Sequence, residues 1–75
     1  MPVIIRLQHC VITMYFADHN PPHFHVVTPD AEAQVTIASL DLMEGSVDRR
    51  ALREALDWAE QNRATLWAKW DEFNP

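Results

Sequence analysis

The hydrophobic pattern of this chain changes its period once, near residue 48, and this change restricts the fold more than any other feature. Before it, short apolar runs separated by turn-forming residues predict β-strands. After it, from about residue 48 to 73, apolar side chains recur on one helical stripe: Leu52, Ala55, Leu56, Ala59, Leu66, Trp67, Trp70 and Phe73. The order predicts an α+β fold, a small antiparallel β-meander of about four strands followed by one long C-terminal α-helix packed on the sheet.

The strand pattern occurs in four segments: residues 3–7, 11–16, 23–28 and 32–39. The last of these alternates most clearly, because Ala33, Val35 and Ile37 face one way while Glu32, Gln34 and Thr36 face the other. Residues 40–45 are interpreted as a connection that holds at most a brief strand.

Length and composition favour one small domain, residues 1–75, in a reducing compartment. Cys10 has no second cysteine to pair with, and no apolar run approaches the length of a membrane span. The N-terminus does not have the pattern of a signal peptide. We therefore expect a cytoplasmic protein without membrane partners.

The segment 18–25 carries the sharpest chemical pattern, with Asp18, His19, His23 and His25 around two consecutive prolines. On a strand, residues two apart share a face and lie about 6.7 Å apart, so the second and third histidines can converge on one ligand. The loop could return Asp18 and His19 to the same place. Three imidazoles and a carboxylate form a normal shell for a divalent transition metal such as zinc.

Two other interpretations of this histidine cluster stay open at this stage. His19, His23 and His25 could be catalytic acid–base groups without a metal, because imidazole titrates near neutrality. Alternatively, the histidines could simply hold the Pro-Pro turn through hydrogen bonds to the backbone, with Asp18 capping it. No cofactor follows from the sequence with certainty.

Two further features suggest a protein partner or a homodimer. The 11–16 segment is apolar on both faces, although one helix can cover only one face, and Trp58 lies off the helical stripe. Arg49, Arg50 and Arg53 near the helix start suggest a site for an anion or an acidic partner, or else a solvated face. The net charge of −5 disfavours nucleic acid as that partner.

The sequence resembles the uncharacterised bacterial family catalogued as domain of unknown function 4160. The resemblance lies in Asp-His-Asn-Pro-Pro-His-Phe-His-Val at 18–26, with Glu44-Gly45, Arg-Arg-Ala-Leu at 49–52 and Trp-Ala-Glu at 58–60. Asp48 departs from the pattern, which usually has proline there. The resemblance implies a bacterial protein, often encoded beside another small uncharacterised protein in a toxin–antitoxin-like arrangement, and it implies no reaction.

Two functions follow as hypotheses. The first, non-enzymatic, is a partner-binding or regulatory module, a component of a toxin–antitoxin-like pair. The second is a small histidine-based hydrolase or nuclease, with or without a metal ion, acting on phosphate esters. In that role His23 and His25 would be ligands or acid–base groups, and the arginines would hold phosphate.

Overall fold

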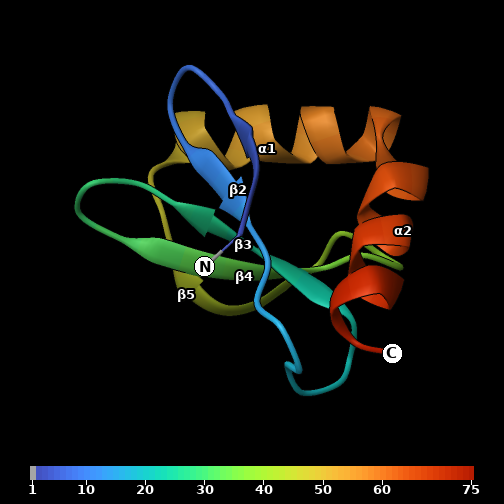
Figure 1. Ribbon diagram of the computed structural model, residues 1–75. Helices are drawn as coiled ribbons and strands as arrows, with labels where there is room; N and C mark the ends of the chain where they lie inside the picture. Colours follow the sequence, from blue (N-terminus) through green and yellow to red (C-terminus); the bar gives the residue numbers. More distant parts are fainter. Residues whose placement is uncertain (1) are drawn as a thin grey trace.

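The computed structural model describes residues 2–75 and is an α+β fold (Figure 1). Five antiparallel strands pair in chain order to form one sheet: β1 Val3–Arg6, β2 Val11–Thr13, β3 His23–Val27, β4 Glu32–Thr36 and β5 Leu42–Ser46. Two helices follow, α1 Arg49–Gln61 and α2 Arg63–Phe73. The fold class and the antiparallel order are therefore as predicted, with one more strand and one more helix.

The fifth strand was expected only as a brief strand within a connection, because its residues do not alternate in hydrophobicity. β5 is an edge strand with mostly exposed side chains, so no apolar pattern marks it. Its fit to β4 depends on Gly45, which has φ +71, and where a Cβ would lie 2.3 Å from the Glu32 carbonyl oxygen. Glycine is the residue that tolerates both conditions.

Two predicted strands end three residues earlier than expected, and the other two end one residue earlier. β2 ends at Thr13 rather than at residue 16, and Phe16 stands 64% exposed in the loop that follows. β4 ends at Thr36, because the chain turns there through Leu40, which has φ +59. The Thr36 hydroxyl contacts the Ser39 hydroxyl at 2.8 Å and accepts from the Asp41 backbone N–H at 3.1 Å, which stabilises the turn.

The predicted single helix is interrupted at Asn62. The Asn62 backbone has φ −130 and ψ 28, its N–H bonds the Ala59 carbonyl, and its side-chain amide donates to the Trp58 carbonyl at 2.8 Å. Arg63 then donates from Nε to the Ile37 carbonyl at 3.1 Å and ties the start of α2 to the turn after β4. Figure 1 shows α2 turning sharply away from α1 at this point.

The core lies between the helices and one face of the sheet. Asp48 caps α1 by accepting from the Ala51 N–H at 2.9 Å, and three alanines then let α1 approach the strands closely. The buried apolar residues are Cys10, Ile12, Met14, Phe24, Val26, Ala33, Val35, Ile37, Ala51, Ala55, Ala59, Leu66, Trp70 and Phe73. Burial, with the nearby Glu54 carboxylate, raises the pKa of Cys10 to about 11, so its thiol stays protonated.

Candidate functional site

His23 and His25 lie on the face of β3 opposite to the core residues Phe24 and Val26. The shared face was predicted from the period of a strand, and the two imidazole rings are 5.1 Å apart. Both side chains are nevertheless buried, with rings from the loop of residues 14–22 and from α2 packed against them. Tyr15, from this loop, packs its ring edge-on to His25 at 4.4 Å.

The end of α2 places the loop that carries Asp18. The Ala17 N–H donates to the Phe73 carbonyl at 3.0 Å, and the Asp18 N–H donates to Asn74 Oδ1 at 2.6 Å. Ala17 has φ 51, which reverses the chain before the Asn20–Pro21 bond, itself cis. The Asp18 carboxylate is thereby directed back toward β3.

Asp18, His23 and His25 converge at one point. Oδ2 of Asp18 lies 3.0 Å from Nε2 of His23 and 3.3 Å from Nε2 of His25. One ligand atom from each residue lies within 4.8 Å of the other two. Ligand atoms bound tetrahedrally to zinc at 2.0–2.1 Å are about 3.3 Å apart, so the two separations that involve Asp18 match those around one ion.

The outer nitrogen of each imidazole has a partner that fixes the tautomer. Nδ1 of His23 is 2.8 Å from the Pro21 carbonyl oxygen, and Nδ1 of His25 is 2.6 Å from Oε2 of Glu32. Because a carbonyl and a carboxylate accept hydrogen bonds, each Nδ1 carries a proton. In the neutral imidazoles both Nε2 atoms then direct a lone pair at the Asp18 carboxylate.

Such facing lone pairs repel, so either extra protons or a metal ion must lie between them. Nε2 of His23 is fully buried and has no hydrogen-bond partner among the residues that the structure describes. Histidines that ligate metals usually have the arrangement seen here, with Nδ1–H donated to a carbonyl or carboxylate.

The Asp18 carboxyl group is held in its charged form. Burial by itself raises its pKa, but a 2.8 Å hydrogen bond from the His19 N–H, a hydrogen bond with His25 and the charges of His23 and His19 outweigh this effect. The net result is a pKa below the ordinary value. A charged carboxylate beside two imidazole nitrogens is a donor set for a divalent cation.

His19 does not join this group in the structure. Its ring stacks on His23 at 4.9 Å and its side chain is 63% exposed, with Nε2 3.7 Å from the other oxygen of Asp18. Of the four residues predicted as metal ligands, the structure therefore brings three together and leaves His19 at the edge.

Glu32 belongs to the site but was not among the predicted site residues. The alternating pattern already assigned it to the outer face of its strand, which is the face of the histidines. Pairing of β3 with β4 brings that face beside His25 across a short turn at residues 28–31. The sequence therefore placed Glu32 on the correct face, but its assignment to the site required knowing that these two strands pair.

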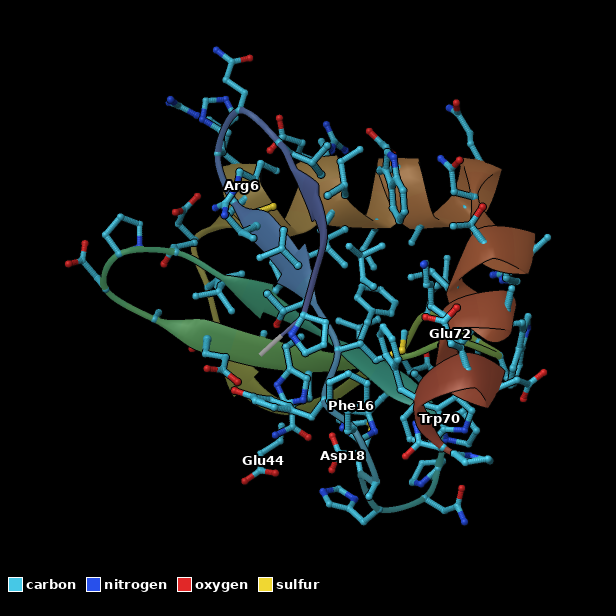
Figure 2. All side chains as sticks on the ribbon, in the orientation of Figure 1. Arg6, Phe16, Asp18, Glu44, Trp70 and Glu72 are labelled. Atoms are coloured by element: carbon cyan, nitrogen blue, oxygen red, sulfur yellow. The ribbon has the colours of Figure 1, made fainter. Side chains whose placement is uncertain are left out.

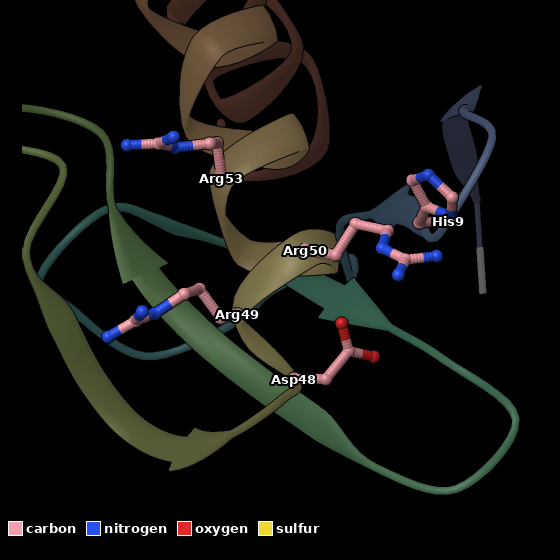
Figure 3. Close-up of a pocket in the computed structure, with 5 residues that line it drawn as sticks. All are labelled: His9, Asp48, Arg49, Arg50 and Arg53. Carbon is pink, nitrogen blue, oxygen red and sulfur yellow. The ribbon is translucent and has the colours of Figure 1, made fainter.

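The three predicted arginines lie elsewhere, around a hollow of about 620 Å³ lined by His9, Asp48, Arg49, Arg50 and Arg53 (Figure 3). Figure 1 shows the β1–β2 turn, which carries His9, at the opposite end of the molecule from the 14–22 loop. Trp58 does not line this hollow; it is half-buried against the core. The structure thus does not bring the arginines and the histidine cluster together.

Fold and site together define a small α+β domain with an Asp–His–His cluster at the junction of a loop and a strand. Residues 10–71 match the family described as domain of unknown function DUF4160, and the chain belongs to that family. No curated protein and no solved structure matched. Within residues 2–75, neither helix is long and apolar enough to cross a membrane.

Proposed function

We propose that the protein is a metal-binding domain that holds a divalent transition-metal ion, with zinc as the best fit. Nε2 of His23, Nε2 of His25 and Oδ2 of Asp18 are the ligands. The main observation in its support is that Nε2 of each histidine faces Asp18. The hydrogen bonds of Nδ1 with Pro21 and Glu32 fix the tautomer of each imidazole in this orientation. Imidazole with carboxylate suits zinc better than magnesium or calcium, which prefer oxygen ligands.

Calorimetric titration of zinc into the metal-free chain tests the proposal. We expect one ion per chain with a dissociation constant below about 1 µM, which corresponds to about 8 kcal/mol. Asp18→Asn keeps the shape of the side chain but removes its charge, so it is expected to bind zinc much more weakly. His9→Ala, which removes a histidine at the opposite end, is the matched control. Wild-type affinity no better than millimolar would refute the proposal.

A separate prediction concerns Glu32, which touches a ligand and not the ion. Replacing it by glutamine keeps a side chain that can hydrogen-bond Nδ1 of His25 but removes the negative charge. Loss of such an outer partner typically costs about 10–100-fold in metal affinity. We expect zinc binding in Glu32→Gln to weaken within that range at unchanged stoichiometry, as measured by competition with a chromogenic chelator. Glu44→Gln, on the neighbouring strand, is the control.

Partner binding is a second candidate function, and the arginines favour it. Half of the six basic residues line one hollow, and the structure has no carboxylate within 4.0 Å of these three guanidinium groups over residues 2–75. The nearby Glu54 carboxylate instead accepts from the Gln8 and His9 N–H groups at 3.0 and 2.7 Å. Unpaired charges near a helix start, where they oppose its dipole, suit an acidic protein partner.

This second candidate includes the role of a regulatory component in a bacterial, cytoplasmic, toxin–antitoxin-like pair, and self-association as a homodimer. Its test is binding of a glutamate-rich peptide, followed by fluorescence anisotropy at low and high salt. We expect binding that weakens with salt and is lost in an Arg49→Gln/Arg50→Gln/Arg53→Gln variant. Equal binding by that variant would contradict the assignment. Sedimentation of the wild type at micromolar concentration tests the homodimer.

A hydrolase or nuclease acting on phosphate esters has less support. Such an enzyme needs cations to hold the phosphate close to the metal ion. The hollow beside Asp18 is lined by Ala17, Asp18, Asn20, Trp70, Asn74 and Pro75, without a lysine or arginine. The arginines line the other hollow, at the opposite end of the molecule.

A further inference from the structure

The last turn of α2 is attached to the loop that supplies Asp18 to the histidine site. The Ala17 N–H donates to the Phe73 carbonyl at 3.0 Å, and the Asp18 N–H donates to Asn74 Oδ1 at 2.6 Å. The rings of Phe16 and Phe73 also pack edge-on, with their centroids 4.7 Å apart. Figure 2 shows Phe16 and Asp18 at the same end of the molecule as the last turn of α2. Three consecutive loop residues therefore contact the end of α2.

Asn74 is fixed in the position that receives the Asp18 bond. It is the residue that ends α2: its backbone N–H donates to the Trp70 carbonyl at 2.9 Å, and its side-chain Nδ2 donates to the same carbonyl at 3.1 Å. The amide oxygen, which can only accept, is then directed at the Asp18 N–H. The bond between loop and helix therefore requires the last turn of α2 to be wound.

The loop needs this support because of the backbone at Ala17. Its φ of 51 lies in the left-handed region, which is unfavourable for a residue that has a Cβ. Such a conformation persists only where surrounding contacts impose it, and the bond from its N–H to the Phe73 carbonyl is one of those contacts. If the end of α2 moved away, Ala17 could relax to ordinary backbone angles. The Asp18 side chain, which follows it, would then turn away from Nε2 of His23 and His25.

The last turn of α2 depends on the loop in return. Among residues 71–75 only Phe73 is buried, and the other side chains are exposed or half-buried. α2 has 11 residues and no side-chain cap at its start, and a helix of this length is marginal in water without packing. Leu66 and Trp70 hold its middle in the core. The hydrogen bonds from the loop are therefore a large part of what holds the final turn.

We propose that metal binding and docking of the last turn of α2 are coupled, with Asn74 as the positioning residue that links them. Asp18 takes part in both, because its carboxylate faces the two histidines and its N–H bonds Asn74. An ion bound to Oδ2 of Asp18 fixes the loop and so favours its bonds to α2. By linkage, a docked α2 raises the affinity for the ion by the same factor. This inference rests on the proposed metal site and adds a way in which its affinity is controlled.

Zinc titration of three variants tests the effect of α2 on the site. Asn74→Ala removes the hydrogen bond to Asp18 and is expected to weaken zinc about 3–10-fold. Asn74→Asp keeps an accepting oxygen and is expected to stay close to the wild-type affinity. Glu72→Gln changes an exposed side chain of the same turn and is the control. Equal affinity of Asn74→Ala and the wild type, or equal losses in both Asn74 variants, would overturn the inference while the metal site stands. Absence of zinc binding in the wild type would overturn both.

Amide hydrogen exchange, measured by NMR with and without saturating zinc, tests the effect of the site on α2. The Asn74 N–H reports the last turn of α2, and the Asp18 N–H reports its bond to the loop. We expect zinc to slow exchange at both by about tenfold. The Leu7 N–H, which donates to the Cys10 carbonyl at the opposite end, is the control and is expected to keep its rate. An unchanged rate at Asn74, or equal slowing at Leu7, would overturn the coupling.

Discussion

Zinc is expected to raise the melting temperature of the wild-type chain by about 10–20 °C when its free concentration is 100 times the dissociation constant. A ligand that binds only the folded state contributes about 2.7 kcal/mol at that concentration. In a domain of this size each kcal/mol shifts the midpoint by about 4–8 °C. The His23→Ala/His25→Ala variant lacks two of the three ligands, so zinc is expected to leave its midpoint unchanged.

Thermal scans with and without zinc, followed by circular dichroism, measure this shift. The shift, and not the absolute midpoint, is compared, because removing the buried His23 side chain also leaves a cavity that destabilises the variant. His9→Ala removes a histidine that touches no part of the site and is expected to keep the full zinc shift. Equal shifts in the wild type and the double variant would mean that zinc binds elsewhere.

The two histidines could be predicted as a pair because their geometry is local. Any strand that contains His23 and His25 puts them on one face, and the prolines before His23 favour a strand start at that residue. The sequence could not predict how far the shared face would be buried. That burial comes from rings of the 14–22 loop and from Trp70 of α2, which are brought to the strand by contacts far apart in the sequence.

The position of Asp18 depends on residues far along the chain. Its backbone is held by Asn74, 56 residues away, and the adjacent Ala17 by Phe73. No local pattern links these residues, so the sequence could only suggest that the loop returns to the strand. The sequence also could not predict the orientation of His19. Its place in the motif suggested a metal ligand, but the loop turns its side chain toward solvent.

The helix prediction failed at one place for a related reason. The apolar stripe of residues 48–73 is compatible with a straight helix, and Asn62 alone is a weak stop signal. A contact with the turn after β4, the bond from Arg63 Nε to the Ile37 carbonyl, accompanies the bend. The bend lets Leu66, Trp70 and Phe73 reach the core and brings the end of α2 to the 14–22 loop.

Trp70 is expected to be the residue whose loss harms both the fold and the site most. Its side chain is only 6% exposed, it packs beside His23 at 5.5 Å, and it lines the hollow next to Asp18. Trp70→Ala is expected to lower the free energy of unfolding by about 3–5 kcal/mol, a typical cost for a buried aromatic residue. That is a large part of the total of about 4–11 kcal/mol for a chain of this length.

Urea denaturation of the metal-free protein measures this effect, and two variants separate packing from site geometry. Trp67→Ala removes a half-buried tryptophan of the same helix and is expected to cost clearly less. Trp70→Phe keeps an aromatic wall beside His23, so it is expected to retain zinc affinity within about threefold while losing part of the stability. Equal losses for Trp67→Ala and Trp70→Ala would contradict this role, because the position beside His23 would then carry no special weight.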